Sequence, residues 1–354
     1  MSYPVPDLAT IEADILRDIA NQDADADTTT DSDNGIRAAA TASAVSGLYD
    51  HQQWIARQIF PDSADPDMLA RHATLHGLSK KQAKAAEGTI LLNGQPNEQA
   101  GSGLIVLAPD GTQYQTTAAA ALGADGTGTV SAIAVVAGSA GNLDEGTALA
   151  LSSPPQNFSS VASVVSMVGG TDVETDDELL ARLLDLLRHP PAGGNAYDYR
   201  RWAMDVSGVT AAYVYPLRRG PGTVDVLITS GSGLPSASTI NAVKTHIDTL
   251  RPAGIADVWV GGPVIRSIDF LVALQVSSGE PEDMQPTVQT TLANWMAAFR
   301  PADPMIRSQA EALISTLNGV VDRAIQTPTA NVTPENSGET IEWLQLGNVQ
   351  VVPL

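Results

Sequence analysis

Residues 169–178, with the sequence GGTDVETDDE, mark the point at which the pattern of the chain changes. Five leucines after this segment recur at intervals of three and four residues, which is the spacing of one helical face. Thr175 and Glu178 form the pattern of a capping box, and acidic residues in a first turn are favoured by the helix dipole. The sequence His-Pro-Pro at 189–191 ends the pattern, because proline lacks the backbone donor that a helix needs. Residues 176–188 are therefore predicted to form a helix whose apolar face consists of Leu179, Leu180, Leu183, Leu184 and Leu187.

The length of 354 residues exceeds what one hydrophobic core usually serves, so several domains are expected. An apolar content of 43% permits real cores, and the aromatic content of only 5% favours thin domains built from small side chains. We predict an α+β, multi-domain fold with an N-terminal helical bundle-forming segment at 1–87 and a small antiparallel β domain at 88–170. Two α/β units follow, at 171–262 and 263–354, and a ferredoxin-like arrangement is one option for them.

The N-terminal segment carries apolar stripes with little sequence around them that could cover them. One stripe lies on a helix near the start of the chain, and a second lies on a long helix at 36–60. Such helices are hard to stabilise alone, so an intramolecular core and a subunit interface are both open for them. The candidate interface residues here are Ile11, Ile15, Ile19, Leu48, Trp54, Ile55 and Ile59.

The region 88–170 has short runs of β-forming residues separated by glycines, with a turn pattern at Pro109-Asp110-Gly111. This pattern predicts a small antiparallel sandwich or barrel. Beyond it, helices and strands alternate, and the order helix, Gly-Val, strand occurs at both Gly208-Val209 and Gly319-Val320. That repetition suggests two related α+β units.

The last unit is predicted to contain a strand at 267–277, helices at 284–299 and 308–317, and a strand at 320–326. The tail from Pro328 is rich in Pro, Thr and Asn and closes with a small apolar end, a candidate for docking. Trp295 and Phe299, on a helix of this unit, are also open to a core or an interface role and complete the candidate interface set.

Charge and cysteine content exclude several kinds of function. The formal net charge is −21, from 40 acidic and 19 basic side chains, and such a surface repels phosphate backbones and anionic lipid. We therefore expect no nucleic-acid partner and no membrane partner. Because the chain contains no cysteine, disulfides, thiolate metal sites and cysteine nucleophiles are excluded. No signal peptide or membrane span is visible in the sequence, so we expect no export by that route.

No residue pattern predicts a catalytic, cofactor-binding or metal site. The acidic loop at 23–34 fails the EF-hand spacing, since its sixth and twelfth positions counted from Asp31 are Ile36 and Ala42. His72 and His76 lie one helical turn apart without the glutamate of a zinc protease. The carboxylates between 172 and 178 could suggest a glycosidase pair, but capping and dipole roles account for most of them.

Several motifs occur in an order and spacing that, taken together, resemble the baseplate J-like family of contractile phage tails. The resemblance covers most of the chain and fades toward the C-terminus. Besides 169–178, its motifs are Phe60-Pro61-Asp62-Ser63-Ala64, Gly77-Leu78, Ala86-Glu87-Gly88, the segment PAGGNAYDY at 191–199, Gly208-Val209 and Gly220-Pro221-Gly222-Thr223-Val224.

The resemblance implies a structural wedge subunit of the virion tail baseplate, assembled in the bacterial cytoplasm. Such a subunit forms a ring that links the central hub to the peripheral wedge and fibre network and rearranges on sheath contraction. Its N-terminal helices would join a bundle with a second copy and with the neighbouring wedge protein of the gp7 or P2 gpI type. A gp25-like wedge component and the hub would be further partners, and C-terminal domains would pair between copies. The resemblance implies no enzymatic activity and no cofactor, and it leaves open a phage or a tailocin.

Two alternatives belong to other classes. A secreted or surface carbohydrate-binding protein would need an export signal and an exposed aromatic platform in 88–170, where only Tyr114 and Phe158 are aromatic. A polysaccharide hydrolase would lose activity when Asp172 or Glu174 is replaced. Neither alternative accounts for the ordered set of motifs.

Overall fold

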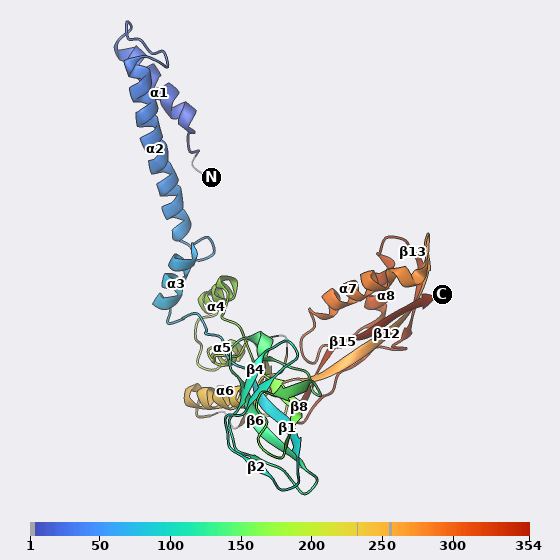
Figure 1. The fold of residues 1–354 in the computed structure, drawn as a ribbon. Coiled ribbons are helices and arrows are strands. Elements are labelled where there is room, and N and C mark those ends of the chain that lie inside the picture. The colour runs from blue at the N-terminus through green and yellow to red at the C-terminus, as the bar shows by residue number, and fades with distance from the viewer. Residues whose placement is uncertain (1–3, 232, 255–256) are drawn as a thin grey trace. The chain divides into compact units, whose positions relative to one another are not determined.

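The computed structural model describes residues 4–231, 233–254 and 257–354 and divides into two compact units (Figure 1). Unit 1 consists of Met1–Lys80 together with Thr175–Arg188, and unit 2 consists of Lys81–Glu174 together with His189–Leu354. Unit 1 is therefore discontinuous in sequence. Its helices are α1 (Leu8–Gln22), α2 (Asp33–Gln58), α3 (Pro66–Leu75) and α4 (Asp176–Arg188).

Helices α1 and α2 form an antiparallel hairpin, drawn in blue in Figure 1. The Asp7 carboxylate accepts a hydrogen bond from the Thr10 N–H (2.8 Å) and caps α1, and Ser32 caps α2 in the same way. On α2 the buried side chains facing this contact are the small Ala38 and Ala42. Small side chains allow two helices to approach closely, which explains the alanine-rich first half of α2.

Helices α3 and α4 pack together although the sequence between them is long. The predicted capping box of α4 is confirmed: the Thr175 N–H donates to Glu178 Oε2 (2.8 Å), and the Glu178 N–H donates to Thr175 Oγ1 (3.2 Å). Gly77, with φ +75°, follows the end of α3. The core between the helices consists of Leu69, Ala73, Leu78, Leu179 and Leu183.

The β region of unit 2 is a closed barrel with the strand order β1-β6-β4-β3-β7-β8. This confirms the barrel among the two predicted options. The barrel is filled by small and branched side chains around the fully buried Tyr114. Its strands are β1 (Glu87–Gly94), β3 (Ile105–Leu107), β4 (Gln113–Thr116), β6 (Thr127–Ala134), β7 (Ala148–Leu151) and β8 (Phe158–Val168), with a side pair β2 (Gln99–Ala100) and β5 (Ala120–Ala121) and a short 3-10 helix η1 (Ser139–Gly141).

The central part of unit 2 follows the order helix, strand, strand, helix, strand. In its sheet, of order β11-β10-β9, β10 pairs antiparallel with β9 and parallel with β11. Its core includes Tyr199, Trp202, Val226 and Ile247. The elements are α5 (Ala196–Met204), β9 (Ala211–Pro216), β10 (Thr223–Thr229), α6 (Ala237–Leu250) and β11 (Asp257–Gly261).

The C-terminal part of unit 2 packs helices against a sheet of order β13-β12-β15-β14. Strand β12 pairs antiparallel with β13 and parallel with β15. The alternating residues Ile268, Phe270, Val272 and Leu274 of β12 face the helices. The elements are β12 (Val264–Val276), η2 (Pro281–Met284), α7 (Gln285–Met296), α8 (Arg307–Ser315), β13 (Val320–Thr327), β14 (Asn336–Ser337) and β15 (Thr340–Pro353).

The tail after Pro328 does dock: about half of it forms β15, which lies in the sheet between β12 and β14, and Val349 and Val351 of its apolar end are buried in the core. One expectation needs correction, because the ferredoxin-like option is wrong. A ferredoxin-like unit has the order β-α-β-β-α-β, whereas the described elements run α-β-β-α-β in the central part and β-α-α-β-β-β in the C-terminal part.

The repeated Gly-Val motif does have one structural meaning in both places. Gly208 and Gly319 each have φ +91° and each lie between a helix and the strand that follows it. Among the described helices, none is long and apolar enough to cross a bilayer.

Candidate interaction surfaces

The predicted apolar stripe of α2 lies on the surface of unit 1. Leu48 is 62% exposed, Ile55 48% and Ile59 60%. Ile36 and Phe60 are also exposed. Because the buried side chains that α2 turns toward α1 include Ala38 and Ala42, the large apolar side chains remain on the free side of the helix.

The apolar stripe of α1 is more buried than that of α2. Ile11 is buried, and Ile15 and Ile19 are half-buried, where α1 packs against α2. The structure therefore brings these three side chains into the hairpin and leaves those of α2 outside it.

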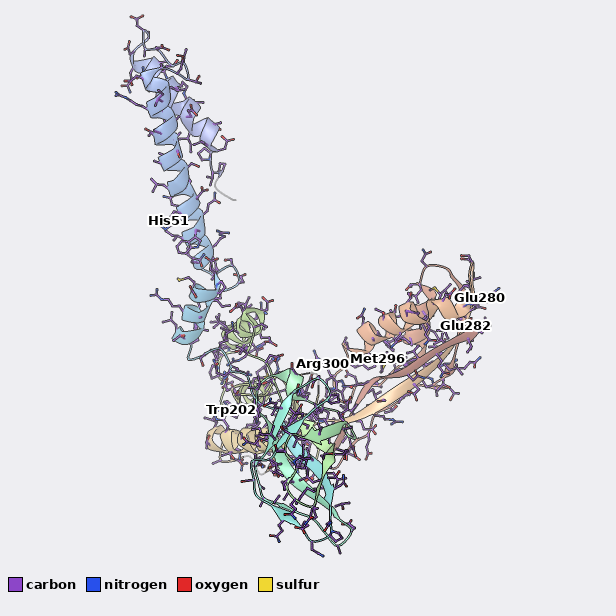
Figure 2. All side chains as sticks on the ribbon, in the orientation of Figure 1. His51, Trp202, Glu280, Glu282, Met296 and Arg300 are labelled. Atoms are coloured by element: carbon purple, nitrogen blue, oxygen red, sulfur yellow. The ribbon has the colours of Figure 1, made fainter. Side chains whose placement is uncertain are left out.

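Trp54 combines exposure with a structural contact. Its Nε1–H donates to Asp65 Oδ2 (2.6 Å), and Gln58 Nε2 donates to the same oxygen (3.2 Å). Asp65 occupies the N-cap position of α3, but its side chain makes no capping hydrogen bond. Its carboxylate instead ties the end of α2 to the start of α3. The neighbouring His51 ring, labelled on α2 in Figure 2, lies 5.7 Å from the Trp54 ring centroid.

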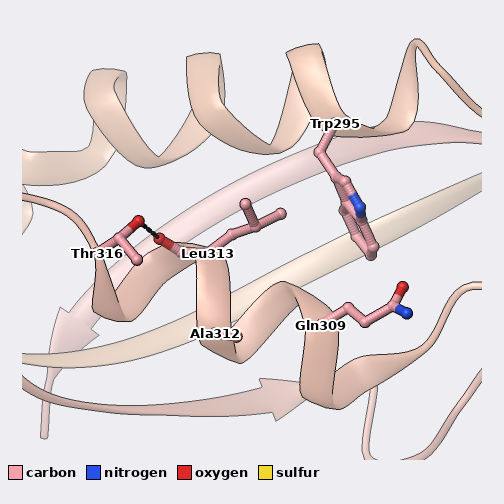
Figure 3. Close-up of a pocket in the computed structure, with 5 residues that line it drawn as sticks. All are labelled: Trp295, Gln309, Ala312, Leu313 and Thr316. Atoms are coloured by element: carbon pink, nitrogen blue, oxygen red, sulfur yellow. Dashed lines mark hydrogen bonds between the residues drawn. The ribbon is translucent and has the colours of Figure 1, made fainter.

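Trp295 and Phe299 are half-buried against the C-terminal core. Their rings meet edge to face with centroids 4.8 Å apart, and Trp343 donates from Nε1 to the Phe299 carbonyl (2.9 Å). Trp295 also borders a shallow, largely apolar cavity of about 380 Å³ between α7 and α8 (Figure 3). The other residues that line this cavity are Gln309, Ala312, Leu313 and Thr316.

The carboxylates considered for hydrolysis have structural partners. Asp172 accepts from the Ser139 hydroxyl (2.6 Å) and backbone N–H (2.9 Å), and these bonds hold its pKa below the ordinary value. Glu174 is buried and accepts from the Lys81 N–H (2.9 Å). His72 Nε2 lies 2.8 Å from the Gln58 carbonyl. In the described part of the chain, no group of three or more metal-ligating side chains gathers.

The segment 191–199 forms a nest around one buried carboxylate, which the sequence reasoning missed. Asp198 is 1% exposed, and its Oδ2 accepts from the N–H groups of Gly194 (2.7 Å), Ala192 (3.1 Å) and Asn195 (3.2 Å). Burial by itself raises the pKa of Asp198, but these bonds and the charge of Arg201 hold the pKa below its ordinary value. A Gly-Gly pair preceding an Asn-x-x-Asp capping box was the available signal, because left-handed glycines can turn successive N–H groups inward.

A polar junction joins the barrel to the central part of unit 2. Lys84 Nζ donates to Thr239 Oγ1 (2.6 Å) and Ser238 Oγ (3.0 Å), and Glu87 accepts from Ser236 and Ser238. Gly169 belongs to the same junction, because a Cβ there would lie 2.8 Å from the Ser236 side chain. The glycine of the motif is thus required by close packing.

A closed barrel hydrogen-bonded to an α+β domain, together with a helix that exposes large apolar side chains, fits a structural protein of an assembly. The comparisons with known proteins agree. The Baseplate J-like protein barrel domain matches residues 89–170, and the Baseplate J-like central domain matches residues 191–262. The chain belongs to the baseplate J-like family.

Two relatives illustrate the membership. Baseplate protein gp47 of Escherichia phage Mu is 30% identical over 323 residues, which is 86% of this chain and 89% of that protein. The Mu-like prophage FluMu protein gp47 of Haemophilus influenzae is 30% identical over 84% of this chain and 88% of its own length. The cryo-EM structure of the anti-feeding prophage baseplate aligns with 94% of this chain over 90% of its own, at a TM-score of 0.39 and 11% identity. The family and the relatives support a structural role in a phage tail baseplate.

Proposed function

We propose that this chain is a baseplate wedge subunit of a contractile tail, which forms part of the ring between the central hub and the peripheral network. The observation that carries the proposal is the exposed apolar face of α2, with Leu48, Ile55 and Ile59 about half or more exposed. Monomeric proteins rarely leave several large apolar side chains on one helical face, whereas helices that complete a bundle with other subunits do so. We further propose that the ring rearranges when the sheath contracts and that this rearrangement leads to host entry.

The N-terminal hairpin is proposed to enter a bundle with a second copy and with the neighbouring wedge protein. Helix α1 already covers one side of α2 with Ile11, so the free side of α2 is the one available to partner helices. The chain is also proposed to contact a gp25-like wedge component and the hub. We also propose that the segments of the chain meet at residues 87, 170 and 262.

The experiment introduces charge on the proposed contact face and on another part of the same helix. Leu48→Glu with Ile55→Glu places two carboxylates on the apolar face. Ser43→Glu with Gln53→Glu places two on exposed positions elsewhere around α2. We expect the first pair to abolish co-purification with neighbouring baseplate proteins and the second to leave it intact. Normal assembly of the first pair would refute the bundle.

Pairing between copies is proposed for the C-terminal part. Strand β13 is an edge of the sheet and exposes Val321 (61%), so it presents unpaired backbone groups and an apolar side chain. In sedimentation of the whole chain, Val321→Arg is expected to lower the dimer fraction. Val135→Arg, at a 52% exposed site in the barrel region, is the matched control. A dimer fraction unchanged by Val321→Arg would count against pairing at this edge.

The carbohydrate-binding alternative gains no support. Tyr114 and Phe158, the aromatic residues of the barrel, are 0% and 9% exposed. Neither can stack on a sugar at the surface.

A further inference from the structure

The central and C-terminal parts of unit 2 have separate hydrophobic cores that share no residue. The chain passes from one to the other through Gly262-Pro263, between β11 and β12. Hydrogen bonds of Arg218 and Tyr215 link the two parts.

The Arg218 side chain is held in place by contacts within the central part of unit 2. Its Nε–H donates to Asp225 Oδ2 (2.7 Å), and Arg219 donates from Nε to the other carboxylate oxygen (2.7 Å). Asp225 is fully buried on β10, the middle strand of its sheet, so the Arg218 side chain, 9% exposed, has a fixed anchor. The guanidinium also lies 5.7 Å from the centroid of the Trp259 ring. Leu217, at φ +61°, lies in the loop that carries Arg218 and Arg219. This loop directs the Arg218 side chain toward the C-terminal part.

The remaining donors of Arg218 reach the C-terminal part. Nη2 donates to the Gly338 carbonyl (2.7 Å), and Nη1 lies 3.4 Å from both the Thr340 carbonyl and Asn336 Oδ1. All three acceptors belong to the hairpin of β14 and β15: Asn336 lies on β14, Gly338 in the turn and Thr340 at the start of β15. They are neutral, so water can replace the guanidinium as their donor without leaving a buried charge on that side.

We propose that Arg218 is a latch that fixes the orientation of the C-terminal part on the central part, with Gly262-Pro263 as the hinge. Opening breaks only the bonds of Arg218 to the C-terminal part, because Asp225, its ionic partner, lies in the central part with it and stays paired. The Tyr215 hydroxyl, which donates to the Pro301 carbonyl (2.7 Å), is a second and weaker fastening. This device goes beyond the proposed function, since it concerns one chain and requires no partner.

The test measures a distance between the two parts in the full chain. The absence of native cysteine allows spin labels at Asn241→Cys on α6 and Gln289→Cys on α7, both exposed positions, to be read by pulsed electron spin resonance. We expect one narrow distance peak in the parent. The open state of such a two-state equilibrium is typically populated at about 0.1–10%, and a variant that breaks the latch is expected to raise it to a resolved second peak.

Four variants decide the question. Arg218→Ala should give the second peak, and Arg218→Lys should do so too, because an ammonium lacks the fork that pairs with Asp225 and reaches Gly338 together. Tyr215→Phe, which leaves Asp225 untouched, should give a smaller second peak and keeps the test decisive if Arg218→Ala fails to fold. Arg219→Ala should leave one peak. A single narrow peak in Arg218→Lys and Tyr215→Phe, or equal broadening in Arg219→Ala, would overturn the proposal.

Discussion

Replacing Asp198 by asparagine is expected to loosen the loop at 191–195 selectively. The carboxylate accepts from three backbone N–H groups and pairs with Arg201 Nη2 (3.1 Å) while almost wholly buried. A hydrogen bond to a charged acceptor contributes about 1.5–3 kcal/mol, against about 1 kcal/mol for a neutral one. The amide NH₂ of asparagine would also face the donor of Arg201. Taking the difference as about 1 kcal/mol for each of the three amides, the local opening free energy should fall by about 3 kcal/mol, with a range of about 2–4 kcal/mol.

Amide hydrogen exchange at Gly194 and Asn195 measures this change directly. A fall of about 2–4 kcal/mol corresponds to exchange about 30- to 1000-fold faster in the variant, since 1.36 kcal/mol is tenfold. Asp62→Asn, at an exposed carboxylate, is the matched control and should change nothing there. Exchange within about threefold of the parent in Asp198→Asn would show that the nest does not stabilise the loop.

The pH dependence gives a second check with a fixed sign. The folded pKa of Asp198 lies below its ordinary value of about 3.9. Its stabilising contribution is therefore complete above about pH 4 and is lost as the pH falls through the lowered folded pKa. The difference between parent and Asp198→Asn should shrink at lower pH. A difference that grows on acidification would contradict the assignment.

Three further outcomes are expected. Leu183→Ala removes a fully buried side chain between α3 and α4 and should cost about 2–5 kcal/mol of α4 protection in hydrogen exchange, whereas Leu187→Ala, at a 44% exposed site, should cost little. Gly88→Ala would place a Cβ 1.8 Å from a β8 carbonyl oxygen and should prevent soluble expression or lower the melting temperature strongly, while Gly101→Ala, with nothing within 4 Å, should not. Burial raises the pKa of Tyr215 to about 12, so its neutral phenol stabilises the fold fully below about pH 10, and this contribution is lost as the pH rises toward 12. Ultraviolet titration of Tyr215→Phe against the parent should show one late-ionising phenol missing; equal curves would contradict that.

Local patterns predicted the elements well where the signals were near in sequence. The capping box of Thr175 and Glu178, the helix at 176–188 and its end before the prolines at 190 and 191 all follow from residues within a few positions of one another. Sequence distance limited the rest. The parallel pairing of β15 with β12 joins segments about 80 residues apart, and nothing local in the tail announces it.

The candidate surface shows the same division. Periodicity identified the large apolar side chains of α2 as one face. It could not show that the small Ala38 and Ala42 would pack against α1. Nor could it show that the Asp65 carboxylate would accept a hydrogen bond from Trp54 and not cap α3. That outcome depends on the turn that brings α2 and α3 together.

The insertion of the barrel between α3 and α4 in the chain has a consequence for biogenesis. The side chains that cover Leu69 and Ala73 are those of α4, which is synthesised only after about 100 intervening residues. The helical unit therefore cannot close while the nascent chain is short, and the apolar face of α3 stays uncovered until the barrel segment has been made.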